Sequence, residues 1–170
     1  MRSEWIPKGE IEHILASLNP ANRLVCEVSL ATGLRVSDVL ALKTEQIRKE
    51  RFTVREQKTG KCRTVRLPEA LRERCLLCCG TVYVFQGRLN GRKPRTRQAV
   101  FKDLRRARER FNIKANLSLH SLRKAYAVEE YRRSGRDLKR VQKLLNHDSE
   151  AVTLLYAMAD ELTRRKKFKA

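Results

Sequence analysis

Four side chains able to handle a phosphate group lie close together in the C-terminal part of the sequence. His120 and Arg123 are three residues apart, so a helix would carry both on one face. His147 and Tyr156 follow, on what read as two further helices. Guanidinium and imidazole groups bind phosphate oxygens, and a phenol can form a covalent bond to phosphorus. The stretch from Ser118 to Tyr156 therefore indicates a phosphate-handling site.

Two basic residues from earlier in the chain extend this set. Arg35 follows Gly33, which ends one predicted helix, and stands where the next helix begins. There a guanidinium can bind phosphate with two N–H groups, and the helix N-terminus adds positive potential. Lys58 lies in the turn of a predicted β-hairpin. Each residue alone is weak evidence, because most arginines and lysines of a basic protein are simply solvated.

The charge of the chain indicates a polyanionic partner. The 170 residues include 39 Lys and Arg against 19 Asp and Glu, a formal net charge of +20. Such an excess repels itself in a compact fold unless a polyanion neutralises it. Nucleic acid is the leading candidate, ahead of an anionic membrane surface or a merely basic solvated surface. The sequence has no apolar run of membrane-spanning length and no signal-peptide pattern, so we expect a cytoplasmic, nucleoid-associated protein.

The cysteines do not form a recognisable metal site. Cys75 and Cys78 have the spacing of half a zinc site, but no second Cys or His pair at ligand spacing follows them. We predict reduced, buried or half-buried thiols, and no metal or other cofactor.

The elements that position these residues are mostly helical. Helices are predicted over 7–18, 20–31, 36–42, 68–78 and 96–111, the last with Val100, Phe101 and Leu104 facing inward. Ser118, Asp137 and Ser149 are expected to be N-caps of three more helices, and 161–170 a last basic helix or tail.

Alternating apolar and polar residues over 51–56 and 62–67 predict a β-hairpin with its turn at 58–61. We expect a third short strand around 46–48 and another extended segment at 83–85. Four arginines are assigned to the solvent face of the hairpin: Arg51, Arg55, Arg63 and Arg66. The predicted fold class is α+β, mainly helical, with one small three-stranded antiparallel sheet, in a single domain over residues 1–170.

Several motifs in this order resemble the tyrosine recombinase (phage integrase) family. They are Ala31–Asp38, the Lys58–Lys61 turn, Leu119–Ala127, Leu144–Ser149, and Tyr156 nine residues after His147. The resemblance covers nearly the whole chain and corresponds to the catalytic domain of the family. It implies that the N-terminal core-binding domain of the family is absent from this chain.

The resemblance implies a covalent route of DNA cleavage. Tyr156 would be the nucleophile, and Arg35 and Arg123 would stabilise the charge that develops on the phosphoryl oxygens. The product would be a 3′-phosphotyrosyl DNA with a free 5′-hydroxyl, with no metal required. The implied partner is double-stranded DNA, with four protomers on two DNA sites during recombination and a monomer allowed in solution. A bacterial, phage or mobile-element origin would fit this activity.

The remaining roles concern protons and phosphate hydrogen bonds. Lys58 would protonate the departing 5′ oxygen, and the resemblance favours it over Lys61. His120 would take the tyrosine proton or orient that network, and His147 would donate a hydrogen bond to the phosphate. Each has a structural alternative: a solvated turn lysine, a core histidine, a helix-end histidine, and for Tyr156 a core tyrosine.

Other basic residues are expected to contact the DNA backbone without reading sequence. They are Arg63, Arg66, Arg92, Lys93, Arg95, Arg97, Arg105 and Arg106. Two alternatives to recombination stay open: a catalytically silent DNA-binding relative, and DNA relaxation of the type IB topoisomerase kind.

Overall fold

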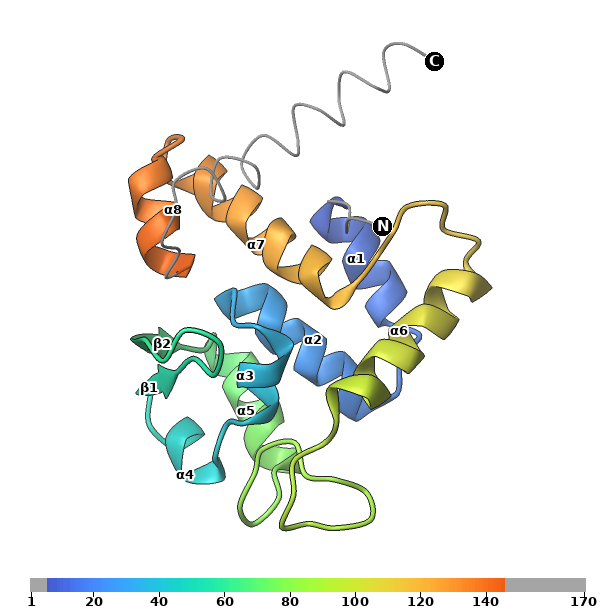
Figure 1. Cartoon of the computed structure of the whole chain (residues 1–170), viewed down its shortest axis with the longest axis vertical. Helices are drawn as coiled ribbons and strands as arrows, with labels where there is room; N and C mark the ends of the chain where they lie inside the picture. The colour runs from blue at the N-terminus through green and yellow to red at the C-terminus, as the bar shows by residue number, and fades with distance from the viewer. Residues whose placement is uncertain (1–5, 146–170) are drawn as a thin grey trace.

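The computed structural model describes residues 6–145, so the predicted positions of His147, Ser149, Tyr156 and the 161–170 segment lie outside the described residues (Figure 1). Helices and a single hairpin make up this part of the chain, which confirms the predicted α+β, mainly helical class. The elements are α1 Lys8–Leu15, α2 Pro20–Thr32, α3 Val36–Leu40, α4 Thr44–Ile47, β1 Arg51–Arg55, β2 Cys62–Arg66, α5 Glu69–Cys78, α6 Arg97–Arg110, α7 Leu119–Arg133 and α8 Leu138–Leu145.

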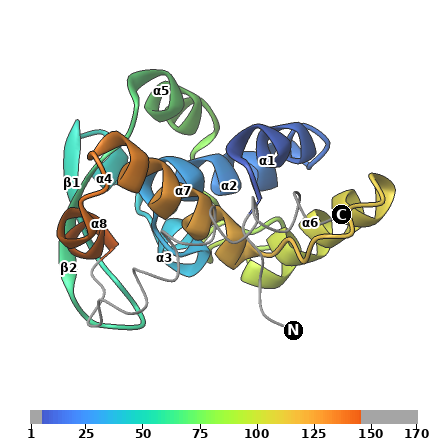
Figure 2. The ribbon, with the colours of Figure 1, turned by 90° about the horizontal axis from the view of Figure 1, so that it is seen from above.

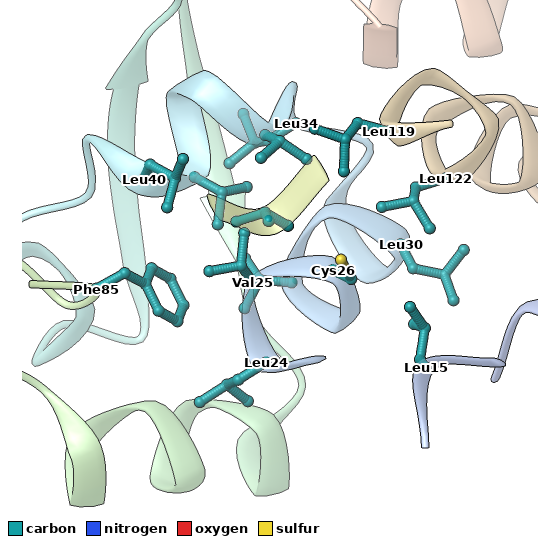
Figure 3. Close-up of a cluster of buried hydrophobic side chains, with 14 of the residues drawn as sticks. Leu15, Leu24, Val25, Cys26, Leu30, Leu34, Leu40, Phe85, Leu119 and Leu122 are labelled. Atoms are coloured by element: carbon teal, nitrogen blue, oxygen red, sulfur yellow. The ribbon is translucent and has the colours of Figure 1, made fainter. Parts of the chain in front are cut away.

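Helix α2 is the centre of the core. Its N-terminus is capped by Asn19, whose side chain accepts a hydrogen bond from the Ala21 N–H at 3.1 Å. Its C-terminus ends at Gly33, which has a left-handed φ of 67°. Between these ends α2 packs against α1, α3, α5, α6 and α7. Figure 3 shows its buried side chains meeting leucines from α1, α3 and α7.

The sheet within residues 6–145 has two strands rather than the predicted three. Strands β1 and β2 pair antiparallel, and Gly60 in their turn has the expected positive φ. The predicted strand at 46–48 is wrong, because Thr44–Ile47 forms the short helix α4. The Gln46 side chain accepts from the Lys43 N–H at 2.8 Å and donates to the Thr53 carbonyl at 2.8 Å. A side chain thus occupies the edge of β1 where a third strand would pair.

Two local predictions need adjustment. The extended segment at 83–85 forms only an isolated bridge between Tyr83 and Lys43, with the Val84 N–H donating to the Leu42 carbonyl. Phe101, predicted to face inward, is 42% exposed. The inward stripe of α6 consists of Val100, Leu104 and Ala107, at the spacing of one helix face, and Phe101 is turned about 100° from it.

Helices α7 and α8 carry the C-terminal half of the candidate site. Ser118 caps α7, because its side chain accepts from the His120 N–H at 3.2 Å. Asp137 accepts from the Arg140 N–H at 2.9 Å, which fits its predicted role at the start of α8. Figures 1 and 2 both show α8 beside the hairpin. None of the helices within residues 6–145 has the length and apolar character needed to cross a membrane.

Candidate active site

Arg35 is held at the beginning of α3 by the turn that ends α2. Leu34 is fully buried, so the chain after Gly33 is anchored and Arg35 becomes the N-cap residue of α3. Its side chain is 16% exposed and donates a hydrogen bond to the Glu56 carboxylate. Its Nη1 also lies 4.0 Å from Asp38 Oδ2. The guanidinium is therefore fixed between two carboxylates.

Arg123 is the largest fully buried side chain within residues 6–145, with 2% exposure. It donates hydrogen bonds to the Gly33 carbonyl and, at 2.6 Å, to the Leu145 carbonyl. Gly33 lies two residues before Arg35 in sequence, and Leu145 lies two residues before His147. Arg123 thus links the turn that carries Arg35 to the end of α8.

His120 lies near the positive charges of the site. Partial burial and then the charges of Arg97, Arg123, Arg35 and Lys58, in that order, lower the pKa of its imidazole. A charge influences a pKa mainly from within about a Debye length, so these cations lie in the neighbourhood of the imidazole. Hydrogen bonds link three of the six predicted positions: Arg35 bonds Glu56, which accepts from Thr59 beside Lys58, and Arg123 bonds the carbonyl of the turn that carries Arg35.

Two buried carboxylates complete the polar cluster, and the sequence interpretation did not assign them a role. Glu56 is 0% exposed, bonds Arg35, and accepts from Thr59 Oγ1 at 3.1 Å. Asp38 is 1% exposed and accepts from the Gln57 N–H at 2.9 Å. Burial raises the pKa of Asp38, and the Glu56 charge adds to this, while Arg35 and Arg123 oppose it. The alternation along β1 could have predicted the burial of Glu56, because residue 56 lies on the same inward face as Phe52 and Val54.

Arg63 is not on the solvent face of the hairpin, so that prediction is wrong. Its side chain is 12% exposed and donates to the Thr32 and Leu144 carbonyls, and its Nη1 lies 4.0 Å from Glu56 Oε1. Burial lowers the pKa of the guanidinium, which nevertheless stays charged. The reason is strand parity: Arg63 shares its face with the buried Val65, whereas Arg66 points to the opposite side.

The other predicted DNA-backbone residues differ in exposure. Arg95 is half-buried and donates to Asn22 Oδ1 at 3.0 Å, which ties its loop to α2. Arg66 and Arg105 are exposed and paired with Glu50 and Glu109 at 2.6 and 2.8 Å. The remaining four are also exposed: Arg92, Lys93, Arg97 and Arg106. Their DNA contacts stay a prediction.

Sulfur chemistry does not enter this cluster. All five cysteines carry free thiols, with Cys62 and Cys78 exposed rather than buried. Burial raises the pKa of Cys26 and of Cys75 to about 12, so these thiols are protonated at neutral pH. Within residues 6–145 no three His, Cys, Asp or Glu side chains gather as metal ligands would.

Comparison with known proteins identifies the family. The sequence profile described as the phage integrase family matches residues 4–162. The chain belongs to the phage integrase family. Curated relatives of this family member include a probable integrase/recombinase, YoeC, of Bacillus subtilis, 27% identical over 94% of this chain and 90% of that protein. The tyrosine recombinase XerD of Staphylococcus aureus is 31% identical over 86% of this chain and 53% of that protein.

Solved structures of tyrosine recombinases share the fold of this phage integrase family member. A lambda integrase dimer (residues 75–356) bound to a COC′ core site superimposes with a TM-score of 0.75 at 22% identity, over 92% of this chain and 60% of that one. XerA recombinase gives a TM-score of 0.73 at 20% identity, over 96% and 63%. The chain thus spans most of YoeC but only about half of the XerD sequence.

Proposed function

We propose that this member of the phage integrase family is a site-specific tyrosine recombinase catalytic domain that cleaves and rejoins DNA. The observation that carries the proposal is the linked set of contacts around Arg35: its guanidinium bonds Glu56, which accepts from Thr59 beside Lys58, and Arg123 bonds the Gly33 carbonyl two residues before Arg35. Phosphoryl transfer depends mainly on positioning and on fixed positive charge, and this cluster supplies both.

The charge balance of the cluster favours an anionic ligand. Three largely buried guanidinium groups, Arg35, Arg63 and Arg123, face two buried carboxylates, Asp38 and Glu56. The exposed Lys58 and Arg97 add two more positive charges at its rim. A DNA phosphate would reduce this excess, and the Arg35 guanidinium, already fixed between two carboxylates, needs little reorganisation to receive it.

In the proposed step, the Tyr156 oxygen attacks phosphorus and the bond from phosphorus to the 5′ oxygen breaks. The phenol proton passes to His120, whose lowered pKa keeps the imidazole neutral and able to accept it. Lys58 donates a proton to the 5′ oxygen, so the leaving group departs as a hydroxyl. Attack of a 5′-hydroxyl on the phosphotyrosine reverses the sequence and reseals a strand.

The proposed partner is double-stranded DNA, and the proposed assembly for strand exchange is four protomers on two sites. A lambda integrase tetramer bound to a Holliday junction has the same fold, with a TM-score of 0.74. The shared fold is the support for proposing such an assembly here.

The proposal is tested by trapping the covalent intermediate. Nicked duplexes with randomised sequence around the nick lose a short 5′-hydroxyl fragment on cleavage, so the phosphotyrosyl adduct cannot reseal. We expect wild-type protein to form a detergent-resistant DNA adduct and Tyr156→Phe to form none. No adduct with the wild type, or equal adduct with Tyr156→Phe, would contradict catalysis by Tyr156.

A further inference from the structure

Helix α8 rests on a hydrophobic cluster of its own. Val141 and Leu145 pack with Ala127 of α7, and Tyr126 and Tyr131 cover them. This cluster is separate from the main core built around α2. Apolar packing therefore fixes α8 to α7 but not to α2 or the hairpin. The position of α8 relative to those elements depends on polar contacts.

Two arginines supply such contacts at the end of α8. Arg63 donates to the Leu144 carbonyl and Arg123 to the next carbonyl, that of Leu145. The same two side chains also bind consecutive carbonyls at the end of α2, those of Thr32 and Gly33. The last carbonyls of a helix carry the negative end of its dipole and need partners. Two guanidinium groups thus join the C-terminal ends of α2 and α8.

Arg63 also belongs to the hairpin that carries Lys58. It lies on β2, opposite Val54 of β1, and Glu56 comes directly before the turn. Glu56 faces Arg63 at 4.0 Å and bonds Arg35. One side chain therefore connects the hairpin, the end of α2 and the end of α8.

We propose that Arg63 is a positioning residue, which holds the end of α8 in register with the Lys58 hairpin and the Arg35 turn. From the sequence alone Arg63 is expected to contact the DNA backbone, but its two donor groups are directed at protein carbonyls. This inference rests on the proposed function, since the segment after α8 leads to His147 and Tyr156. A small displacement of the end of α8 would slow the chemical step without weakening DNA binding.

The test separates the rate of chemistry from DNA affinity. Arg63→Lys keeps the positive charge but loses the planar pair of donors, and Arg63→Ala loses both. Arg51→Ala is the matched control, because Arg51 lies on the same hairpin with an exposed side chain. We expect both Arg63 variants to form the adduct at least about tenfold more slowly at saturating nicked duplex. Their DNA affinity should follow charge alone, so Arg63→Lys should bind as the wild type does.

A second measurement does not depend on catalysis. Amide hydrogen exchange over residues 138–145 should become faster in both Arg63 variants and stay unchanged in Arg51→Ala. The inference is overturned if Arg63→Lys has the wild-type rate at saturation, or loses affinity at an unchanged rate. It is also overturned if exchange rises equally across α1 to α7, since that is a general loss of stability. If the wild type itself forms no adduct, the proposed function fails, and the exchange data still decide whether Arg63 holds α8.

Discussion

The properties of single residues in this site are set by the charges around them. Partial burial, and then the positive charges near it, lower the pKa of the His120 imidazole, so its proton is held less tightly than in water. Asp38 shows the opposite influence, since burial and a neighbouring carboxylate raise its pKa. A phosphate arriving among these groups would stabilise the protonated imidazole. A bound phosphate would thus favour transfer of the phenol proton to the neutral His120 imidazole during the proposed step.

The His120 ring should titrate below the ordinary value of about 6.5 in the DNA-free protein. Because the folded pKa is the lower one, protonation opposes folding, and stability falls as the pH drops from about 6.5 through the folded pKa. An NMR titration of the imidazole carbon protons measures this value. Arg97→Gln should raise it and Arg110→Gln, at the other end of α6, should not. A folded pKa at or above 6.5 would contradict the described surroundings.

Glu56 should be among the most stabilising polar residues of the hairpin. Glu56→Gln removes the buried counter-charge of Arg35 and Arg63, so we expect the free energy of unfolding to fall by about 3 kcal/mol. Glu50→Gln removes a pair with Arg66 whose side chains are 62% and 63% exposed, and should cost less than about 1 kcal/mol. Urea denaturation compares the two variants, and similar losses would speak against a structural role for Glu56.

Among the elements, the junction between α2 and α3 determines the geometry of the site. Gly33 allows the left-handed turn that ends α2, and its carbonyl accepts from Arg123. The Tyr126 ring of α7 packs directly over this glycine: a Cβ added there would lie 2.3 Å from a ring carbon. The turn therefore serves both as a helix end and as the contact between α2 and α7.

Gly33→Ala should be more destabilising than Gly60→Ala. Both glycines have a positive φ, and the left-handed conformation costs an alanine about 1 kcal/mol at either position. Nothing lies within 4 Å of a Cβ at Gly60, whereas at Gly33 the Tyr126 ring must move, at a further cost of roughly 1–3 kcal/mol. Denaturant unfolding of the two variants isolates this difference. Equal losses would mean that α7 adjusts at no cost.

For the whole molecule, the dominant property is its charge of +20. Exposed basic residues lie on α6 and its preceding loop, among them Arg92, Lys93, Arg97 and Arg106. Contacts from such residues to the DNA backbone would not depend on the base sequence. Binding should therefore be electrostatic and steeply salt-dependent, as counterions are released from the duplex.

Arg106→Ala should weaken binding to all duplexes alike and reduce the slope of log affinity against log salt concentration by about 1. Arg74→Ala removes the same charge from α5, where Arg74 pairs with Glu27 at 2.6 Å, and should leave the slope unchanged. Fluorescence anisotropy over a salt series measures both. An identical slope for Arg106→Ala and the wild type would show that Arg106 does not contact DNA.

The sequence by itself determined the features that depend on neighbouring residues. Ser118 caps its helix as predicted, and Asn19 and Thr96 cap theirs in the same way, because each side chain bonds a backbone N–H two or three positions along the chain. Gly33 and Gly60 take positive φ for the same local reason. The family motifs also depend only on residue type and order, and the match of the family profile to residues 4–162 confirms the family resemblance drawn from them.

The tertiary structure alone decided which polar groups meet. Arg35 bonds Glu56, 21 positions away, and Arg123 bonds the Gly33 carbonyl, 90 positions away. Nothing in the neighbouring sequence of either arginine predicts these partners. The prediction for Arg63 is wrong, although arginine is usually a solvated residue. Its position in β2 puts the side chain on the inward face, where it bonds the carbonyls at two helix ends. Long-range polar contacts form only after apolar packing has brought the elements together, so their partners cannot be derived from spacing along the chain.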